Sequence, residues 1–121
     1  MKTNIKKVNG VSCAVVHSEE IIISDAQTAL DFIATVRYET NCDRVSLNKE
    51  AISENFFNLS TGLAGEILQK FVNYRIKLAI VGEFGNYKSD SLRDFIYECN
   101  NGHSVFFDAV EEQALDKLSK V

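Results

Sequence analysis

The sequence of 121 residues contains no proline and no tryptophan, and it has only two histidines and three cysteines. Because proline is absent, the turns must be built from Gly, Asn, Asp and Ser, and these residues do fall between the apolar segments. Cys13, Cys42 and Cys99 are an odd number of thiols with no CxxC spacing. This pattern indicates reduced, structural cysteines in a cytosolic protein and gives no sign of a disulfide framework.

Long apolar runs are also missing. No stretch approaches the length of a membrane span, and the polar, basic residues 1–7 are not followed by the apolar segment of a signal peptide. The net charge of -4 argues against a surface that neutralises several phosphates of DNA or RNA. We therefore expect a cytoplasmic protein without a membrane or nucleic-acid partner.

The composition is that of an ordinary globular protein. Hydrophobic residues make up 45% of the chain and charged residues 25%, and eight Phe and four Tyr supply bulky core material. The chain has no low-complexity stretch, internal repeat or linker-like region, and its length is close to the commonest domain size. These features predict a single domain over residues 1–121 with one core.

Strand-like and helix-like segments alternate along the chain. Two β-branched runs, residues 5–8 and 12–16, flank Asn9-Gly10, which is the strongest short signal for a β-hairpin. The order ββαβαβαβα predicts an α/β fold with a single mixed five-stranded sheet and helices packed on it. The later segments are a helix over 25–39, a strand over 44–48, a loop with a turn over 49–58, a helix over 59–74, a strand over 77–83, a helix capped by Ser89 or Ser91, a strand over 104–107 and a helix after Asp108.

Several local details are also predicted. Ser24 with Gln27, and Asp108 with Glu111, fit capping boxes at the starts of two helices. The Asn-Asn-Gly run at 100–102 is expected to end a helix through left-handed backbone conformations.

Apolar spacing predicts which faces are buried. The continuous run at 78–81 is typical of a strand covered on both faces, and we expect it to be the centre of the sheet. In the helix over 25–39, the residues that recur at helical spacing and predict the inner stripe are Ala26, Leu30, Ile33, Ala34 and Arg37 or Tyr38.

Ser60, Thr61 and Gly62 open the helix with the clearest apolar stripe. The amino end of a helix has free N–H groups and a positive dipole end, so it stabilises an anion or a phosphorylated serine. The segment is therefore a candidate phosphorylation or anion site, while an ordinary N-cap is the alternative interpretation of the same residues.

The order of elements, together with Ser60-Thr61-Gly62-Leu63-Ala64, resembles STAS domains, the family of anti-sigma factor antagonists. There an Asp-Ser-Ser-Gly-Leu-Gly motif opens the corresponding helix, and the serine after the Asp is phosphorylated by a partner that is both kinase and anti-sigma factor. The resemblance implies that this serine is Ser60, the second hydroxyl Thr61 and the glycine Gly62. This sequence has Leu59 in place of the family's Asp and Ala64 in place of its second Gly.

A second resemblance spans nearly the whole chain. The segments 38–40, 48–50, 59–74 and 91–98 are similar to a bacterial family known as domain of unknown function 4180. The resemblance implies a bacterial cytoplasmic protein of one domain, and it implies no particular activity.

Gly82, Glu83 and Gly85 follow the apolar strand at its carboxyl end, where parallel sheets commonly hold ligands. With Arg93 on the next helix they are a candidate surface for a small molecule or a partner, and a plain strand-to-helix turn is the alternative.

Catalytic and metal sites have little support in the sequence. His17 and His103 lie far apart and have no partner at metal-ligand spacing. Ser60, His103 and Asp108 are the imaginable triad, but no GxSxG elbow is present. We predict no metal, cofactor or catalytic residue. The leading hypothesis is a regulatory module that binds a protein partner and is switched at Ser60, with a ligand-binding domain and a hydrolase as alternatives.

Overall fold

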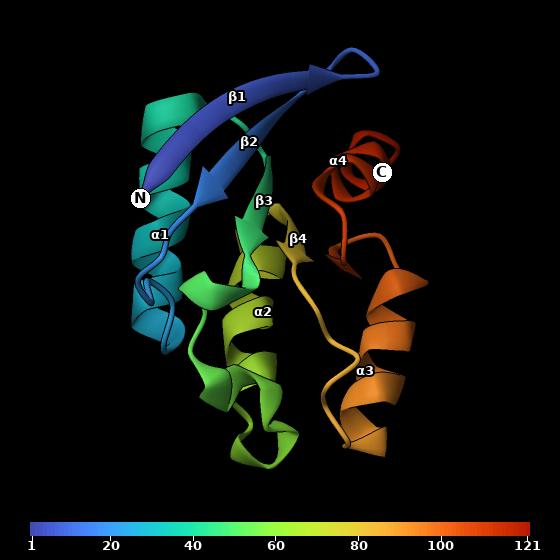
Figure 1. Ribbon diagram of the computed structural model, residues 1–121. Coiled ribbons are helices and arrows are strands. Elements are labelled where there is room, and N and C mark those ends of the chain that lie inside the picture. Colours follow the sequence, from blue (N-terminus) through green and yellow to red (C-terminus); the bar gives the residue numbers. More distant parts are fainter.

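The computed structural model describes residues 1–121 and confirms the predicted order of five strands and four α-helices (Figure 1). Three short 3₁₀ turns, at 49–51, 54–57 and 59–61, lie between β3 and α2. The elements are β1 (Lys2–Val8), β2 (Val11–His17), α1 (Ala26–Thr40), β3 (Arg44–Asn48), α2 (Leu63–Asn73), β4 (Lys77–Val81), α3 (Asp90–Asn100), β5 (Val105–Asp108) and α4 (Glu111–Ser119).

The sheet is mixed, as expected, and its strands follow one another in sequence order, β1-β2-β3-β4-β5. The hairpin of β1 and β2 is antiparallel, and Asn9 and Gly10 turn it with φ angles of 51° and 80°, as a type I′ turn requires. From β2 to β5 every pair is parallel. The central strand is therefore β3, and the expectation that residues 78–81 form the centre was wrong.

The sheet has a separate hydrophobic cluster on each face. Right-handed crossovers between neighbouring parallel strands place α1, α2 and α3 on the same face, where Figure 1 shows them side by side. Leu47, Ile80 and Phe71 are among the fully buried side chains of this larger cluster. On the other face, α4 alone packs against the sheet, with Leu115 and Leu118 buried in the smaller cluster.

The start of α1 differs from the prediction by one residue. Asp25 is the N-cap: its carboxylate accepts from the N–H of Thr28, whose hydroxyl in turn accepts from the N–H of Asp25, so the expected box of Ser24 and Gln27 is wrong. The predicted buried stripe was only partly right, because Ala34 is exposed and Ala26 and Leu30 are half-buried. The residues that α1 buries are Ala29, Phe32, Ile33 and Val36.

Two other predicted caps are also wrong. The N-cap of α4 is Val110, which makes no side-chain cap; Asp108 instead accepts from the N–H of Val110 and from Lys117. The end of α3 has no left-handed residue, because Asn101 has a φ of -87° and its N–H bonds carbonyls within the last helical turn. The predicted cap at Ser89 is confirmed by its bond from the N–H of Leu92.

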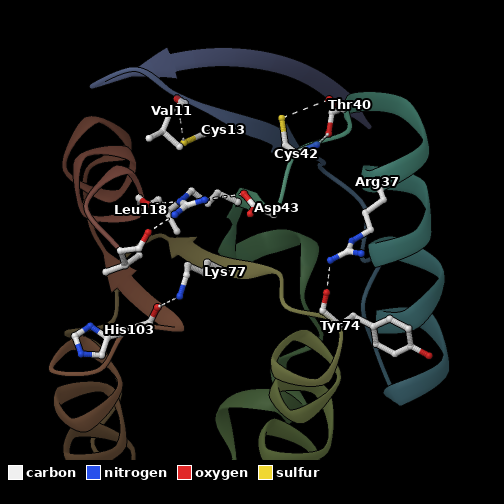
Figure 2. Close-up of polar contacts among 12 residues, drawn as sticks. Val11, Cys13, Arg37, Thr40, Cys42, Asp43, Tyr74, Lys77, His103 and Leu118 are labelled. Atoms are coloured by element: carbon white, nitrogen blue, oxygen red, sulfur yellow. Dashed lines mark hydrogen bonds and ion pairs between the residues drawn. The ribbon is translucent and has the colours of Figure 1, made fainter.

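Cations from neighbouring elements hold the carboxyl ends of three helices. Arg37 of α1 donates to the carbonyl oxygen of Tyr74 at the end of α2, and Lys77 donates to the carbonyl oxygen of His103 after α3, at 2.8 Å (Figure 2). Arg44 of β3 donates to the carbonyl oxygens of Leu118, at 2.7 Å, and of Val121. The negative end of each helix dipole thus faces a positive side chain, which stabilises it.

Replacing Arg44 with Met is expected to lower the free energy of unfolding by about 1–3 kcal/mol, because charged hydrogen bonds to carbonyl groups at the end of α4 are lost. Arg44→Lys keeps the charge but loses the planar fork, so it should restore only part of the stability. Urea unfolding followed by circular dichroism checks both variants. Arg93→Met is the control, because Arg93 is exposed and pairs only with its neighbour Asp90; an equal loss there would contradict the role given to Arg44.

A pH dependence is expected from Asp108, whose side chain is only 8% exposed. Burial raises the pKa of this carboxyl group, but hydrogen bonds from Lys117 and the N–H of Val110 outweigh it and leave the pKa below its ordinary value. The ionised form therefore stabilises the fold above about pH 4, where the unfolded group titrates, and this stability is lost as the pH falls through the folded pKa.

Urea titrations between pH 7 and pH 3 test this contribution. The gap in stability between the wild type and Asp108→Asn should be widest at neutral pH and should shrink as the solution becomes acidic. Asp94→Asn, at an exposed carboxylate, is the matched control. A gap at Asp108 that stays constant with pH would contradict the prediction.

Candidate functional site

The carboxyl ends of the four parallel strands lie at one end of the sheet. Most of the residues singled out in the sequence lie beyond this end. The end is well ordered by side-chain amides: Asn48 accepts from the N–H of Ser18 at 2.8 Å and donates to its carbonyl oxygen at 2.7 Å. These bonds continue the pairing of β2 with β3 past the end of the ladder. The segment 49–62 then leads from the end of β3 to the start of α2.

Ser60 lies in the exposed 3₁₀ turn that leads into α2. Asn58 holds the turn, since its side-chain oxygen accepts from the N–H of Ser60 at 3.3 Å and from the Ser60 hydroxyl at 2.7 Å. The predicted helix over 59–74 is therefore wrong at its start, and α2 begins at Leu63. The cause is Gly62, whose φ of 74° separates the turn from the helix.

Thr61 and Gly62 are structural parts of the same turn. The Thr61 hydroxyl lies 3.1 Å from the carbonyl oxygen of Asn55 and 2.9 Å from that of Asn58, and it accepts from the N–H of Leu63. Gly62 is the N-cap of α2 and offers no side chain to cap it. Of the two predicted hydroxyls, only that of Ser60 is free of a bond to the backbone of the helix start.

The second predicted surface is brought together only in part. Gly85 and Arg93 line the same cavity of about 240 Å³, together with Phe84, Tyr87, Ser89, Leu92 and Ile96. Gly82 lies outside it: a Cβ atom on Gly82 would stand 2.6 Å from the Cβ of Lys49, so this glycine allows Lys49 to cross the end of β4. Glu83 is exposed and does not line the cavity.

Sequence reasoning missed a polar network that joins the two surfaces. The Tyr87 hydroxyl donates to Glu54 at 2.9 Å, and the Lys49 ammonium group lies 3.6 Å from the same carboxylate and 4.8 Å from the centre of the Tyr87 ring. Phe57 stacks on Tyr87 with ring centres 5.3 Å apart. No short motif connects residues so far apart in sequence, so only the fold reveals them.

The network holds its groups in their protonated forms. The hydrogen bond with Tyr87 raises the pKa of Lys49, although burial acts in the other direction. Burial raises the pKa of Tyr87, and its bond to Glu54 adds to the rise. Both shifts oppose the release of a proton, whereas a general base or an amine nucleophile needs the opposite.

The histidines and cysteines are not brought together into a reactive centre. His17 is the last residue of β2, so it lies at the carboxyl ends of the parallel strands. His103 precedes β5 and lies at their amino ends, whereas Asp108 lies at the carboxyl end of β5. The imagined triad of Ser60, His103 and Asp108 is therefore not assembled. Burial raises the pKa of the Cys13 and Cys99 thiols, which disfavours the reactive thiolate.

The structure has no cluster of three or more His, Cys, Asp or Glu side chains able to hold a metal ion. Among the helices, none combines the length and the apolar character needed to span a bilayer.

Comparison with known proteins gives a family and no closer relative. No curated protein and no solved structure matches the chain. The resemblance to STAS domains thus stays a prediction, although the order of elements that suggested it is confirmed. The sequence model of one family, described as domain of unknown function (DUF4180), matches residues 8–118. The chain belongs to this DUF4180 family.

Proposed function

We propose that this chain is a non-enzymatic regulatory module of the bacterial cytoplasm that acts through contact with a partner protein and is switched by phosphorylation of Ser60. The observation that carries the proposal is the position of Ser60: an exposed hydroxyl on a tight turn that leads directly into α2. A kinase can reach such a hydroxyl without unfolding the domain. A partner that contacts the turn also contacts the start of a well-packed helix.

Phosphorylation of Ser60 changes both the charge and the hydrogen bonding of the turn. The Ser60 hydroxyl now donates to the side-chain oxygen of Asn58, with the two oxygens 2.7 Å apart. Esterification removes this proton and adds about two negative charges. The oxygen of Asn58 repels these charges, while the uncapped amino end of α2 attracts them. The turn therefore has two states that differ in charge and in the direction of the Ser60 side chain.

Thr61 and Gly62 have a supporting part in this proposal. Because the Thr61 hydroxyl is bonded to carbonyl groups of Asn55 and Asn58 and to the N–H of Leu63, its modification would break the turn instead of switching it. Gly62 needs its positive φ to separate the turn from α2. Ser60 is thus the modifiable residue of the three.

A small-molecule-binding domain is the second candidate, and the observation in its favour is the cavity lined by Gly85 and Arg93. At about 240 Å³ this cavity is smaller than the roughly 300–1,000 Å³ of ordinary ligand pockets. The sheet also lacks a reversal of strand order, which is where open α/β sheets form their ligand crevice. These two features favour the interaction module.

The Ser60 proposal is tested by capture of partners from native cytoplasm with the wild type, Ser60→Ala and Ser60→Asp, read by quantitative mass spectrometry. We expect at least one partner to differ by about tenfold between Ser60→Ala and Ser60→Asp, as for a typical charge switch at a contact. Protein purified from its own cells should also show phosphate on Ser60.

Ser24→Asp is the matched control, because Ser24 is exposed and lies just before α1 as Ser60 lies before α2. It should leave the set of partners unchanged. Identical partners for all variants, with no phosphate on Ser60, would contradict the proposed function and direct attention to the cavity at Arg93.

A further inference from the structure

A groove of about 330 Å³ runs between α2 and α3 on the helical face of the sheet. On the α2 side its lining includes Gly65, Leu68 and Val72, and on the α3 side Phe95 and Cys99. We call this surface the α2–α3 groove. Among the residues weighed as functional in the sequence, His103 lines the groove, whereas Ser60, Gly85 and Arg93 do not.

The groove exists because α2 leans on α1 and because one of its residues has no side chain. The rings of Phe32 and Phe71 join α1 to α2 with centres 6.3 Å apart. On the opposite side of α2, a Cβ atom added at Gly65 would meet no atom within 4 Å, and Val72 is 47% exposed. Gly65 and Val72 therefore leave the ends of this α2 surface uncovered, with the largely buried Leu68 between them.

The rim of the groove is acidic. Its charge comes from α3, where Asp94 and Glu98 flank Phe95 one helical turn apart, and both carboxylates are exposed. Neither of them takes part in any of the ion pairs within the chain. Burial raises the pKa of Cys99 and the charge of Glu98 adds to the rise, which agrees with a carboxylate beside the groove.

The nearest basic residues do not neutralise this rim. Lys70 lies on the side of α2 away from Gly65 and Val72, by helical spacing. Lys77 lies at the end of the groove formed by His103, and its ammonium group is bound to the carbonyl oxygen of His103 at 2.8 Å. The groove thus combines an apolar floor with unpaired negative charge along its α3 side.

We propose that the α2–α3 groove binds an amphipathic helix of a partner protein, one that places an apolar stripe on Leu68, Val72 and Phe95 and Lys or Arg against the acidic rim. The inference rests on the proposed function, because it names the chemistry of the partner. Apolar side chains at i, i+3 or i+4 and i+7 of a helix cover about 10 Å, which matches the two turns from Gly65 to Val72.

The probe is a displayed library of helical peptides of about 14 residues, long enough to be helical, with outward positions randomised among Leu, Ala, Gln, Lys and Glu. We expect selection on the wild-type protein to enrich peptides with an apolar stripe flanked by Lys. Enrichment of acidic or uncharged peptides, or no enrichment, would overturn the proposal. Self-association blocked by Gly65→Leu would assign the groove to a second copy of the chain and would overturn it as well.

The enriched peptides are then measured against protein variants by fluorescence anisotropy. Gly65→Leu places a side chain in the groove, where its Cβ atom meets no other atom within 4 Å, and should weaken binding by about tenfold or more, as a built-in steric block does. Glu98→Lys should weaken it by about three- to tenfold, and less at high salt. Glu39→Lys makes the same charge change on the exposed end of α1 and should have no effect.

The stability of the Gly65 variants is measured separately by thermal unfolding. The groove proposal and the Ser60 proposal are contradicted by different results. Gly65→Ala should raise the unfolding temperature, because Ala favours a helix more than Gly does, and Gly65→Leu should not lower it. Peptide binding that survives Gly65→Leu overturns the groove but leaves the Ser60 proposal standing. Partner sets that are the same for all Ser60 variants overturn the switch, while the peptide measurements still decide the groove.

Discussion

The unreversed strand order is the constraint on which the rest of this structure depends. Three right-handed crossovers between adjacent parallel strands put α1, α2 and α3 on one face, so α4 alone must cover the other. This explains why α4 is tied down at several points besides its apolar face. Arg44 holds its end, Lys117 pairs with Asp108, Lys6 of β1 pairs with Glu111, and Asn9 at the hairpin tip donates to Asp116 and Ser119. The same order also removes the crevice that a strand reversal would open.

Both edges of the sheet are protected, which leaves the helical face as the surface available for contacts. At β5, the side chain of Asn100 accepts from the N–H of Phe107 at 2.7 Å and donates to its carbonyl oxygen at 3.1 Å, in the manner of another strand. At the other edge, β1 carries Lys2, Lys6 and Lys7, and such charges discourage pairing with another strand. A partner of the proposed kind would therefore be expected at the turn of Ser60 and the groove beside α2, and not at a sheet edge by strand addition.

The parts that sequence reasoning predicted correctly are those governed by local patterns. Asn9-Gly10 specified the hairpin, the alternation of strands and helices specified a mixed five-stranded sheet, and the β3 strand was predicted over the residues it occupies. Helix caps were predicted poorly because several side chains near each helix start could act as the cap. At α4, the predicted cap residue Asp108 instead binds Lys117. The segment 49–62 could not be predicted, because Lys49 and Glu54 find their partner in the distant Tyr87.

In the candidate site, too, local features could be predicted from the sequence, whereas features that depend on tertiary contacts could not. The exposure of Ser60 follows from its place before a helix, but the groove depends on Gly65 and Phe95, which lie thirty residues apart in sequence and meet only through the crossover by β4. Taken together, the two proposals predict the direction of the proposed switch. A phosphate on Ser60 would lie five residues before Gly65, near the amino end of α2 where the lining of the groove begins. If both proposals hold, the added negative charge would strengthen the attraction for a basic helix instead of releasing it.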